Sequence, residues 1–208
     1  LGMHTEMLCD AYLDLYRCGK LTNEKKQLNR GKGIWSFCLG SRELYQWVEE
    51  NPGLASYPVD YTNSPYVISK QDNMVTINNC LQVDLFGQTC AETAGNRQIS
   101  GTGGQMDFLY GSFLSKGGQA FICMASTYRD KVTDRRQSRI VPVLSDGNVV
   151  TDPRSHAYYL VTEYGIVNLA GCSLWERAEK IISIAHPEFR ESLIAEAEKM
   201  GIWKRTNR

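Results

Sequence analysis

Segments with the pattern of β-strands alternate along this chain with segments that have the period of amphipathic α-helices. The clearest strand pattern is the alternation of apolar and polar residues over 74–85. Strands that alternate with helices favour the α/β class, and we expect an open mixed sheet flanked by helices. No internal repeat, low-complexity tract or linker divides the sequence, so we expect a single domain over residues 1–208.

The other elements are predicted from periodicity and from residues that favour helix ends. Thr5, Ser41 and Ser173 fit as N-caps of three helices, and Pro187 fits at the start of a last one. Residues 129–138 are predicted to form a charged loop. The predicted strands are 34–39, 58–60, 74–85, 89–92, 120–124, 139–144 and 158–162, and the predicted helices are 5–18, 41–48, 65–70, 106–114, 173–185 and one from residue 187 onwards.

The charge and the hydropathy of the chain exclude two classes of partner. Lys and Arg number 23 and Asp and Glu number 23, so the formal net charge is zero. A neutral chain lacks the broad basic surface of a nucleic-acid-binding protein. The longest apolar run, residues 120–125, is far shorter than the roughly 18 residues of a membrane-spanning helix. We therefore expect neither a nucleic acid nor a membrane as partner.

The cysteines and histidines indicate no disulfide framework and no metal site. Seven cysteines lie in apolar surroundings without a C-x-x-C pair, which is typical of reduced thiols in a cytoplasmic protein. The three histidines have no metal-ligand spacing, so we expect no metal. The chain begins at Leu1 with neither a methionine nor a signal-peptide pattern, and we expect it to be cut from something longer.

A glycine-rich turn precedes the helix predicted over 106–114. Its residues are Gly101, Thr102, Gly103, Gly104 and Gln105. Backbone N–H groups in such a turn, at the start of a helix, can bind an anion or a developing oxyanion. The turn lacks the third glycine of a dinucleotide fingerprint and the Gly-Lys-Ser/Thr of a P-loop. An ordinary tight turn is the alternative, and spacing alone slightly favours it.

Three further residues are candidates for a site, each with a structural alternative. Glu6 falls in the first turn of a predicted helix, where the helix dipole favours an acid; a carboxylate there can also be a nucleophile. Glu163 follows a predicted strand, at the edge where α/β sheets bind ligands, or it simply faces solvent. Asn78 interrupts an apolar strand and either orients a substrate or forms a bulge.

Taken together, linked motifs along nearly the whole chain resemble those of the C-terminal half of the acetyl-CoA hydrolase/transferase family. Within that family they are most similar to 4-hydroxybutyrate CoA-transferases and butyryl-CoA:acetate CoA-transferases. The family's chains are about twice as long as this one. The motifs lie at residues 1–7, 57–61, 72–75, 98–107, 138–142, 161–165 and 184–190.

The resemblance implies a ping-pong CoA-transferase with an α/β open-sheet fold. It implies that Glu6, in the family's His-Thr-Glu motif, attacks an acyl-CoA thioester and carries CoA as a glutamyl thioester. Gly103 and Gly104 would serve the oxyanion, with Gly101 and Gln105 in the same CoA-binding segment. Asn78 and Glu163 match positions that line the family's active site.

The resemblance also implies partners and leaves alternatives open. Acyl-CoA and a small carboxylic acid (acetate, butyrate or 4-hydroxybutyrate) would be the substrates. The family's N-terminal half would complete the active site, and a homo-oligomer is possible. Residues 127–137 depart from a segment that is rich in glycine and lysine in many relatives. An acyl-CoA hydrolase and a non-catalytic CoA-binding domain that needs a partner chain remain alternatives.

Overall fold

The fold was analysed in a computed structural model, which describes residues 1–202. The chain divides into two compact units. The first contains Leu1–Met74 and Tyr110–Gly118, and the second contains Val75–Leu109 and Gln119–Arg208. Each unit is described by itself, and the single domain expected from the sequence stays a prediction.

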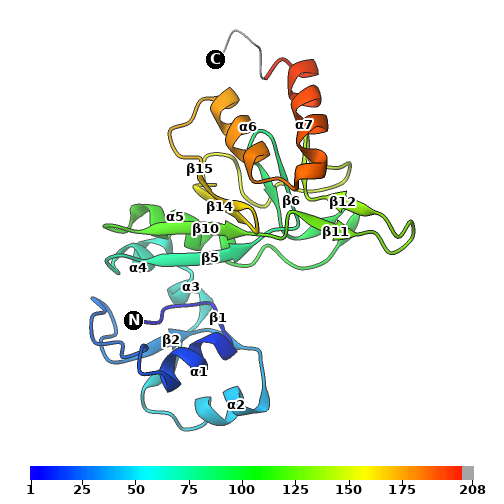
Figure 1. Cartoon of the computed structure of the whole chain (residues 1–208). Helices are drawn as coiled ribbons and strands as arrows, with labels where there is room; N and C mark the ends of the chain where they lie inside the picture. The colour runs from blue at the N-terminus through cyan, green and yellow to red at the C-terminus, as the bar shows by residue number, and fades with distance from the viewer. Residues whose placement is uncertain (203–208) are drawn as a thin grey trace. The chain divides into compact units, whose positions relative to one another are not determined.

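The first unit is built on two short parallel strand pairs. Strand β1 (Met7–Leu8) pairs with β3 (Phe37–Cys38), and β2 (Gly33–Trp35) pairs with β4 (Leu54–Ser56). Met3, Leu8, Leu13, Leu21 and Leu44 form the buried core of this unit. Four helices lie in this unit: α1 (Asp10–Arg17), α2 (Arg42–Val48), α3 (Val59–Thr62) and α4 (Pro65–Ser69) (Figure 1).

Three of the predicted elements of this unit differ in the structure. The first helix begins at Asp10 rather than at residue 5, because residues 7–8 are held as a strand beside β3. Cys9 therefore occupies the N-cap position predicted for Thr5. The predicted strand 34–39 is broken at Ser36 into β2 and β3. Residues 58–60 open helix α3 instead of forming a strand, because Pro58 provides no N–H for a ladder.

The second unit contains a four-stranded sheet in the order β15-β14-β10-β5. Strands β5 (Val75–Asn79), β10 (Gln119–Cys123) and β14 (Tyr159–Thr162) are parallel, and β15 (Gly165–Asn168) is antiparallel to β14. Helices α6 (Leu174–Ser183) and α7 (Pro187–Lys199) lie together on one side of this sheet (Figure 1). The mixed α/β architecture predicted from the sequence is confirmed.

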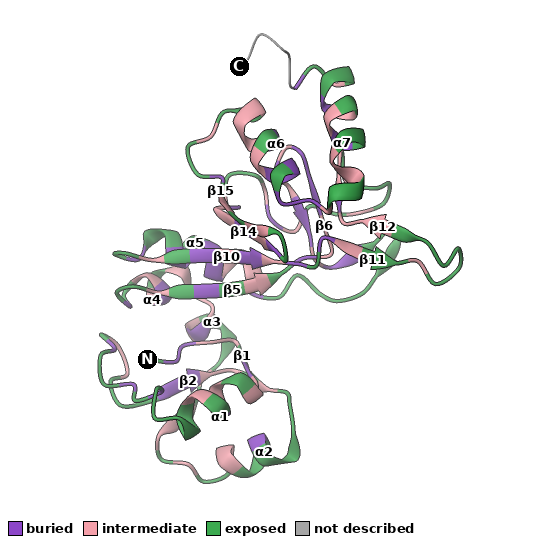
Figure 2. Cartoon of the chain, viewed as in Figure 1, coloured by how far each residue is buried: buried purple, intermediate pink, exposed green. Residues whose placement is uncertain are grey.

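Alternate residues of the central strands form the core of the second unit. Ile122 and Leu160 are buried together with Ile181 from α6 and Leu193 from α7. Buried residues occupy the middle of β10 and most of β6 in the same unit (Figure 2). The core therefore sits between the sheet and the two C-terminal helices.

Smaller sheets and a helix complete the second unit. The predicted strand 74–85 is split, because the N–H of Cys80 bonds to the Cys123 carbonyl whereas that of Leu81 bonds to the Cys90 carbonyl, in a different sheet. The predicted charged loop 129–138 is a hairpin, and the predicted strands 89–92 and 139–144 are only two residues long in the structure.

The smaller strands of this unit are β6 (Gln82–Asp84), β7 (Thr89–Cys90), β8 (Thr93–Ala94), β9 (Arg97–Gln98), β11 (Thr127–Arg129), β12 (Arg136–Ser138) and β13 (Ile140–Val141). Helix α5 (Gln105–Leu114) begins in this unit, and its last turns belong to the first unit.

The caps predicted for the later helices are confirmed. Ser41 caps α2 and accepts a hydrogen bond from the Leu44 N–H. Ser173 forms a capping box with Glu176 at the start of α6. His186 caps α7, and Pro187 takes the first helical position. These local signals depend on few neighbours, which is why the sequence reveals them.

Truncation of a core residue of α6 tests this packing. We expect Ile181→Ala, at a fully buried position, to lower the free energy of unfolding by about 2–5 kcal/mol, because it leaves a cavity in the core. Leu174→Ala in the same helix is the control, since Leu174 is 37% exposed, and should cost about 1 kcal/mol or less. Urea denaturation measures both values, and equal losses would contradict the described core.

Candidate active site

The carboxyl ends of the three parallel strands place polar residues along one edge of the central sheet. Asn78 is in register with Ile122 of β10, and Cys123 is in register with Val161 of β14. Glu163 comes directly after β14. Because the strands are parallel, Asn78 and Glu163 lie toward the same edge, where open α/β sheets bind ligands. The expectation that Glu163 lies at the end of a strand is confirmed.

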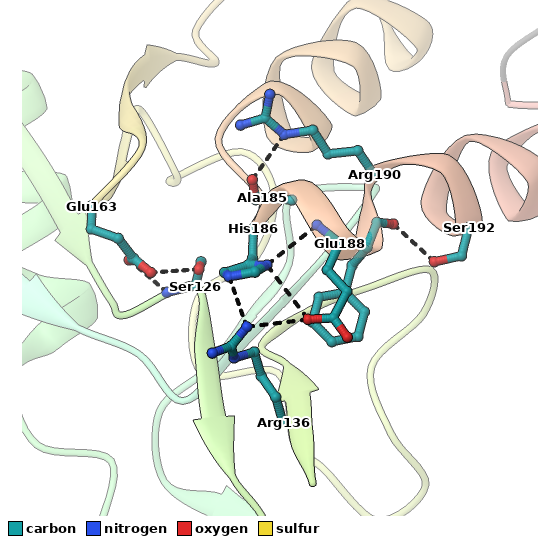
Figure 3. Close-up of polar contacts among 9 residues, drawn as sticks. Ser126, Arg136, Glu163, Ala185, His186, Glu188, Arg190 and Ser192 are labelled. Carbon is teal, nitrogen blue, oxygen red and sulfur yellow. Dashed lines mark hydrogen bonds and ion pairs between the residues drawn. The ribbon is translucent and has the colours of Figure 1, made fainter.

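Glu163 is held by Ser126, which is fully buried just beyond β10. The Ser126 hydroxyl donates to Glu163 Oε1 at 2.6 Å, and its backbone N–H donates to Oε2 at 2.8 Å (Figure 3). Partial burial raises the pKa of Glu163, but the hydrogen bonds from Ser126 oppose this more strongly, and the pKa is below its ordinary value of 4.5. The carboxylate is thus both ionised at neutral pH and fixed in orientation.

A cationic group and an imidazole lie near this carboxylate (Figure 3). Arg136 Nη1 lies 3.2 Å from His186 Nε2 and donates to Glu188 Oε2, also at 3.2 Å. The charge of His186 further lowers the pKa of Glu163. The Thr162 hydroxyl donates to the Ile184 carbonyl at 2.6 Å and fixes the turn that carries His186. Sequence reasoning found His186 only as a capping residue and missed Ser126, which no local pattern marks.

The glycine-rich segment forms the turn that leads into α5. Gly103 has a φ of +57°, in the left-handed region that favours glycine, and Gly104 is buried. The N–H groups of Ile99 and Ser100, just before the turn, donate to the Glu92 carbonyl at 2.8 and 3.3 Å. The helix begins at Gln105, one residue before the predicted start. The first turn of α5 therefore follows the glycines directly, as an anion-binding turn requires.

The Gln105 side chain connects this turn to a buried acid that sequence reasoning missed. Gln105 Nε2 donates to Asp152 Oδ2 at 2.6 Å, and the Thr89 hydroxyl donates to the same oxygen at 2.6 Å. Burial raises the pKa of Asp152; these two hydrogen bonds oppose the rise, but the pKa stays above its ordinary value of 3.8. The pKa of Cys80, the residue that follows β5, is raised mainly by burial of the thiol and secondly by the charge of Asp152.

Glu6 belongs to the first unit and lies at a bend rather than in a helix, so the expected first-turn placement is wrong. Its backbone carbonyl accepts hydrogen bonds from the N–H groups of Ser36 and Phe37, both at 3.0 Å. The preceding residue, Thr5, donates its N–H to the Ile34 carbonyl at 3.0 Å. Glu6 therefore lies between His4, which pairs with β2, and Met7, which pairs with β3. The residue is half-buried.

Two buried polar side chains fix the segment before Glu6. Lys26 Nζ donates to the carbonyls of Met3 and Lys32, both at 2.7 Å, and burial lowers the Lys26 pKa to about 8. His4 Nε2 lies 2.8 Å from the Thr62 carbonyl. Burial lowers the pKa of His4, which favours the neutral ring with its proton on Nε2. The backbone on both sides of Glu6 is thus held by hydrogen bonds.

The predicted site residues are divided between the two compact units. Asn78, Glu163 and the Gln105–Asp152 pair belong to the second unit, whereas Glu6 belongs to the first. Within residues 1–202, no group of three or more His, Cys, Asp and Glu side chains has an arrangement that could hold a metal ion. Each helix in the described part of the chain is too short or too polar to span a lipid bilayer.

The parallel sheet with polar residues at its carboxyl edge defines an α/β protein of the kind that binds ligands at that edge. Residues 40–197 match the acetyl-CoA hydrolase/transferase C-terminal domain, and the chain belongs to this family. The resemblance seen in the sequence is therefore confirmed.

Similar proteins match over most or all of the chain. It is 52% identical to the probable butyrate:acetyl-CoA coenzyme A-transferase of Syntrophomonas wolfei subsp. wolfei (100% of this chain, 46% of the relative). It is 50% identical to the 4-hydroxybutyrate coenzyme A transferase of Clostridium kluyveri (96% and 46%). The crystal structure of RipA from Yersinia pestis has a TM-score of 0.89 at 44% identity (98% and 45%). An acetyl-CoA hydrolase of Saccharomyces cerevisiae is more distant, at 30% identity (93% and 35%). The chain spans about half the length of these CoA-transferase relatives.

Removal of the Ser126 hydroxyl tests the described cause of the Glu163 pKa. We expect Ser126→Ala to raise the pKa of Glu163 toward its ordinary value, because one of the two hydrogen bonds to the carboxylate is lost. Carboxyl chemical shifts in an NMR titration measure the change. Ser192→Ala is the control, since the Ser192 hydroxyl bonds to the Phe189 carbonyl instead, and it should leave the pKa unchanged. An unchanged pKa in Ser126→Ala would contradict this assignment.

Proposed function

We propose that the protein transfers CoA between an acyl-CoA and a small carboxylic acid. The observation that carries the proposal is the identity of about half of all residues, along the whole chain, to relatives named as CoA-transferases. Acetate, butyrate and 4-hydroxybutyrate are the acids that we propose, since butyrate, acetyl-CoA and 4-hydroxybutyrate occur in the names of those relatives and acetate is the acid of acetyl-CoA. Acyl-CoA is then a substrate, and the mechanism needs no metal.

We propose Glu6 as the nucleophile of a ping-pong reaction. Its carboxylate attacks the thioester carbonyl, forms an acyl-glutamyl anhydride and releases the CoA thiolate. The thiolate attacks the glutamyl carbonyl of the anhydride, which gives a glutamyl-CoA thioester and frees the first acid. The second acid attacks this thioester and expels the thiolate, which then attacks the acyl carbonyl of the new anhydride. The products are a new acyl-CoA and regenerated Glu6.

A carboxylate is a weak nucleophile, so this mechanism depends on positioning and on charge stabilisation. The hydrogen-bonded backbone around Glu6 supports the first requirement. For the second, we propose the N–H groups of Gly103 and Gly104, with Gly101 and Gln105 in the same CoA-binding turn. Asn78 and Glu163 are proposed to line the substrate site. The fixed, ionised carboxylate of Glu163 suits a group that orients a polar part of the substrate.

The proposal extends to partners outside this chain. We propose that the N-terminal part present in the relatives completes the active site, and a homo-oligomer remains a further expectation. We propose a cytoplasmic location, as for reduced thiols; all seven cysteines, which lie within the described residues, are free. A non-catalytic CoA-binding domain is the alternative that a mutation of Glu6 distinguishes.

Replacement of Glu6 tests the nucleophile. In the complete protein, we expect Glu6→Gln to lower the transfer rate by about a thousandfold or more, because the amide cannot form the anhydride. Incubation with acetyl-CoA should give a CoA-sized mass adduct on Glu6, located by peptide mapping, in the wild type only. Glu43→Gln is the matched control, since Glu43 is an exposed partner of Arg17, and should keep both rate and adduct. Full activity in Glu6→Gln would remove Glu6 from the mechanism, and CoA binding without turnover in the wild type would favour the binding domain.

Product analysis separates a transferase from a hydrolase. We expect acetyl-CoA consumption to require an added acid such as butyrate, and butyryl-CoA to accumulate in equal amount, because the acid takes the CoA. A hydrolase would consume acetyl-CoA without an acid and release free CoA. Free CoA formed at the same rate with and without butyrate would favour the hydrolase.

A further inference from the structure

The glycine turn ends on a carboxylate that is withdrawn from solvent. Asp152 is 0% exposed, and its Oδ2 accepts hydrogen bonds from Gln105 Nε2 and from the Thr89 hydroxyl, both at 2.6 Å. Its other oxygen, Oδ1, is buried without a hydrogen-bond partner among the described residues. Burial raises the pKa of Asp152; its two hydrogen bonds and the charge of His156 oppose the rise, and the charge of Glu92 adds to it. A carboxyl group in such a place carries a desolvation cost that its hydrogen bonds partly offset.

The backbone holds Asp152 rigidly beside Thr89. The Thr89 N–H donates to the Asp152 carbonyl at 3.1 Å, and the Asp152 N–H donates to the Thr89 carbonyl at 3.3 Å. The N–H of Thr151 also donates to the Thr89 carbonyl, at 2.8 Å. The carboxyl group that receives Gln105 is therefore fixed to β7 through both its side chain and its main chain.

The other end of the glycine turn is fixed to the same segment. Glu92, two residues after β7, accepts the N–H groups of Ile99 and Ser100 with its carbonyl. Its side chain is 9% exposed and has a buried oxygen, Oε2, without a hydrogen-bond partner within residues 1–202. Residues 101–104 thus run between two attachments, Glu92 before them and Asp152 after them, and both attachments rest on residues 89–92.

We propose that Asp152 is a positioning residue, which holds the Gln105 carboxamide and thereby keeps the Gly103–Gly104 turn in its ligand-binding conformation. This inference rests on the proposed function of the turn in CoA transfer. Because Nε2 of Gln105 donates to a carboxylate, the carboxamide has one defined orientation, with Oε1 directed away from Asp152. A turn that is held at both ends loses little conformational freedom when an oxyanion forms beside it. Its N–H donors are therefore already in position, and donors fixed in advance stabilise a developing charge most strongly.

Three variants of the complete protein test the role of Asp152. Asp152→Ala removes the acceptor for Gln105, and we expect kcat to fall by about tenfold to a hundredfold with a smaller change in KM. Asp152→Asn retains an oxygen acceptor of the same shape and should restore most of kcat. Asp84→Ala is the matched control, because Asp84 is another fully buried acid that accepts a glutamine amide, from Gln88 at 2.7 Å. It should reduce stability but leave kcat unchanged.

Amide hydrogen exchange supplies a measurement that does not need the reaction. We expect the amides of residues 100–105 to exchange about tenfold faster or more in Asp152→Ala than in the wild type or in Asp152→Asn, because only the alanine variant lacks an acceptor for the Gln105 hydrogen bond. Unchanged exchange in Asp152→Ala would overturn the positioning role, whatever the activity. An equal fall of kcat in Asp152→Ala and Asp84→Ala would also overturn it, since both would then act through stability. A wild type that transfers no CoA contradicts the proposed function instead, and the exchange data still decide whether Asp152 holds the turn.

Discussion

The parallel pairing of β5, β10 and β14 is the constraint on which the second unit depends. Because these strands share one direction, their carboxyl ends, and the residues that follow them, meet at one edge. Asn78, Ser126 and Glu163 come to this edge from segments that are far apart in the sequence. Ile122 and Leu160 of the same strands are buried in one core with α6 and α7, and this burial fixes the register of the strands. One register therefore determines both the core and the position of the polar edge.

The acids of this chain show how surroundings give one functional group different properties. Glu163 lies exposed at the sheet edge, and the donors of Ser126 keep its pKa low. Asp152 is buried among few donors, and its pKa is raised. The contribution of Glu163 to the free energy of unfolding is therefore fully present above the ordinary pKa of 4.5, and it is lost as the pH falls through the lower pKa of the folded state. The contribution of Asp152 is fully present below its ordinary pKa of 3.8, and it is lost as the pH rises through the higher pKa of the folded state. The two groups oppose each other in the pH dependence of stability.

Elements defined by local sequence signals were predicted correctly, whereas element boundaries that depend on contacts between distant segments were not. The caps at Ser41 and Ser173 and the strand at 159–162 follow from short patterns, and all three are confirmed. The start of α1 depends on the pairing of residues 7–8 with β3, which no local pattern reveals. Asp152 was missed for the same reason, because its partners lie 63 and 47 residues away. The residues of the proposed site were candidates from local patterns; their roles came from resemblance to a family and stay predictions.

Hydrogen bonds fix the backbone around Glu6, the proposed nucleophile. Its carbonyl accepts two N–H groups, and Thr5 before it donates its N–H to the Ile34 carbonyl of β2. Lys26 adds a buried ammonium group that holds the Met3 carbonyl, three residues upstream. Glu6→Gln removes none of these main-chain contacts, so this variant reports on chemistry more than on folding. In the proposed mechanism the reacting atoms must be aligned before the bond forms, so the requirement that these contacts can meet is a fixed position of Glu6.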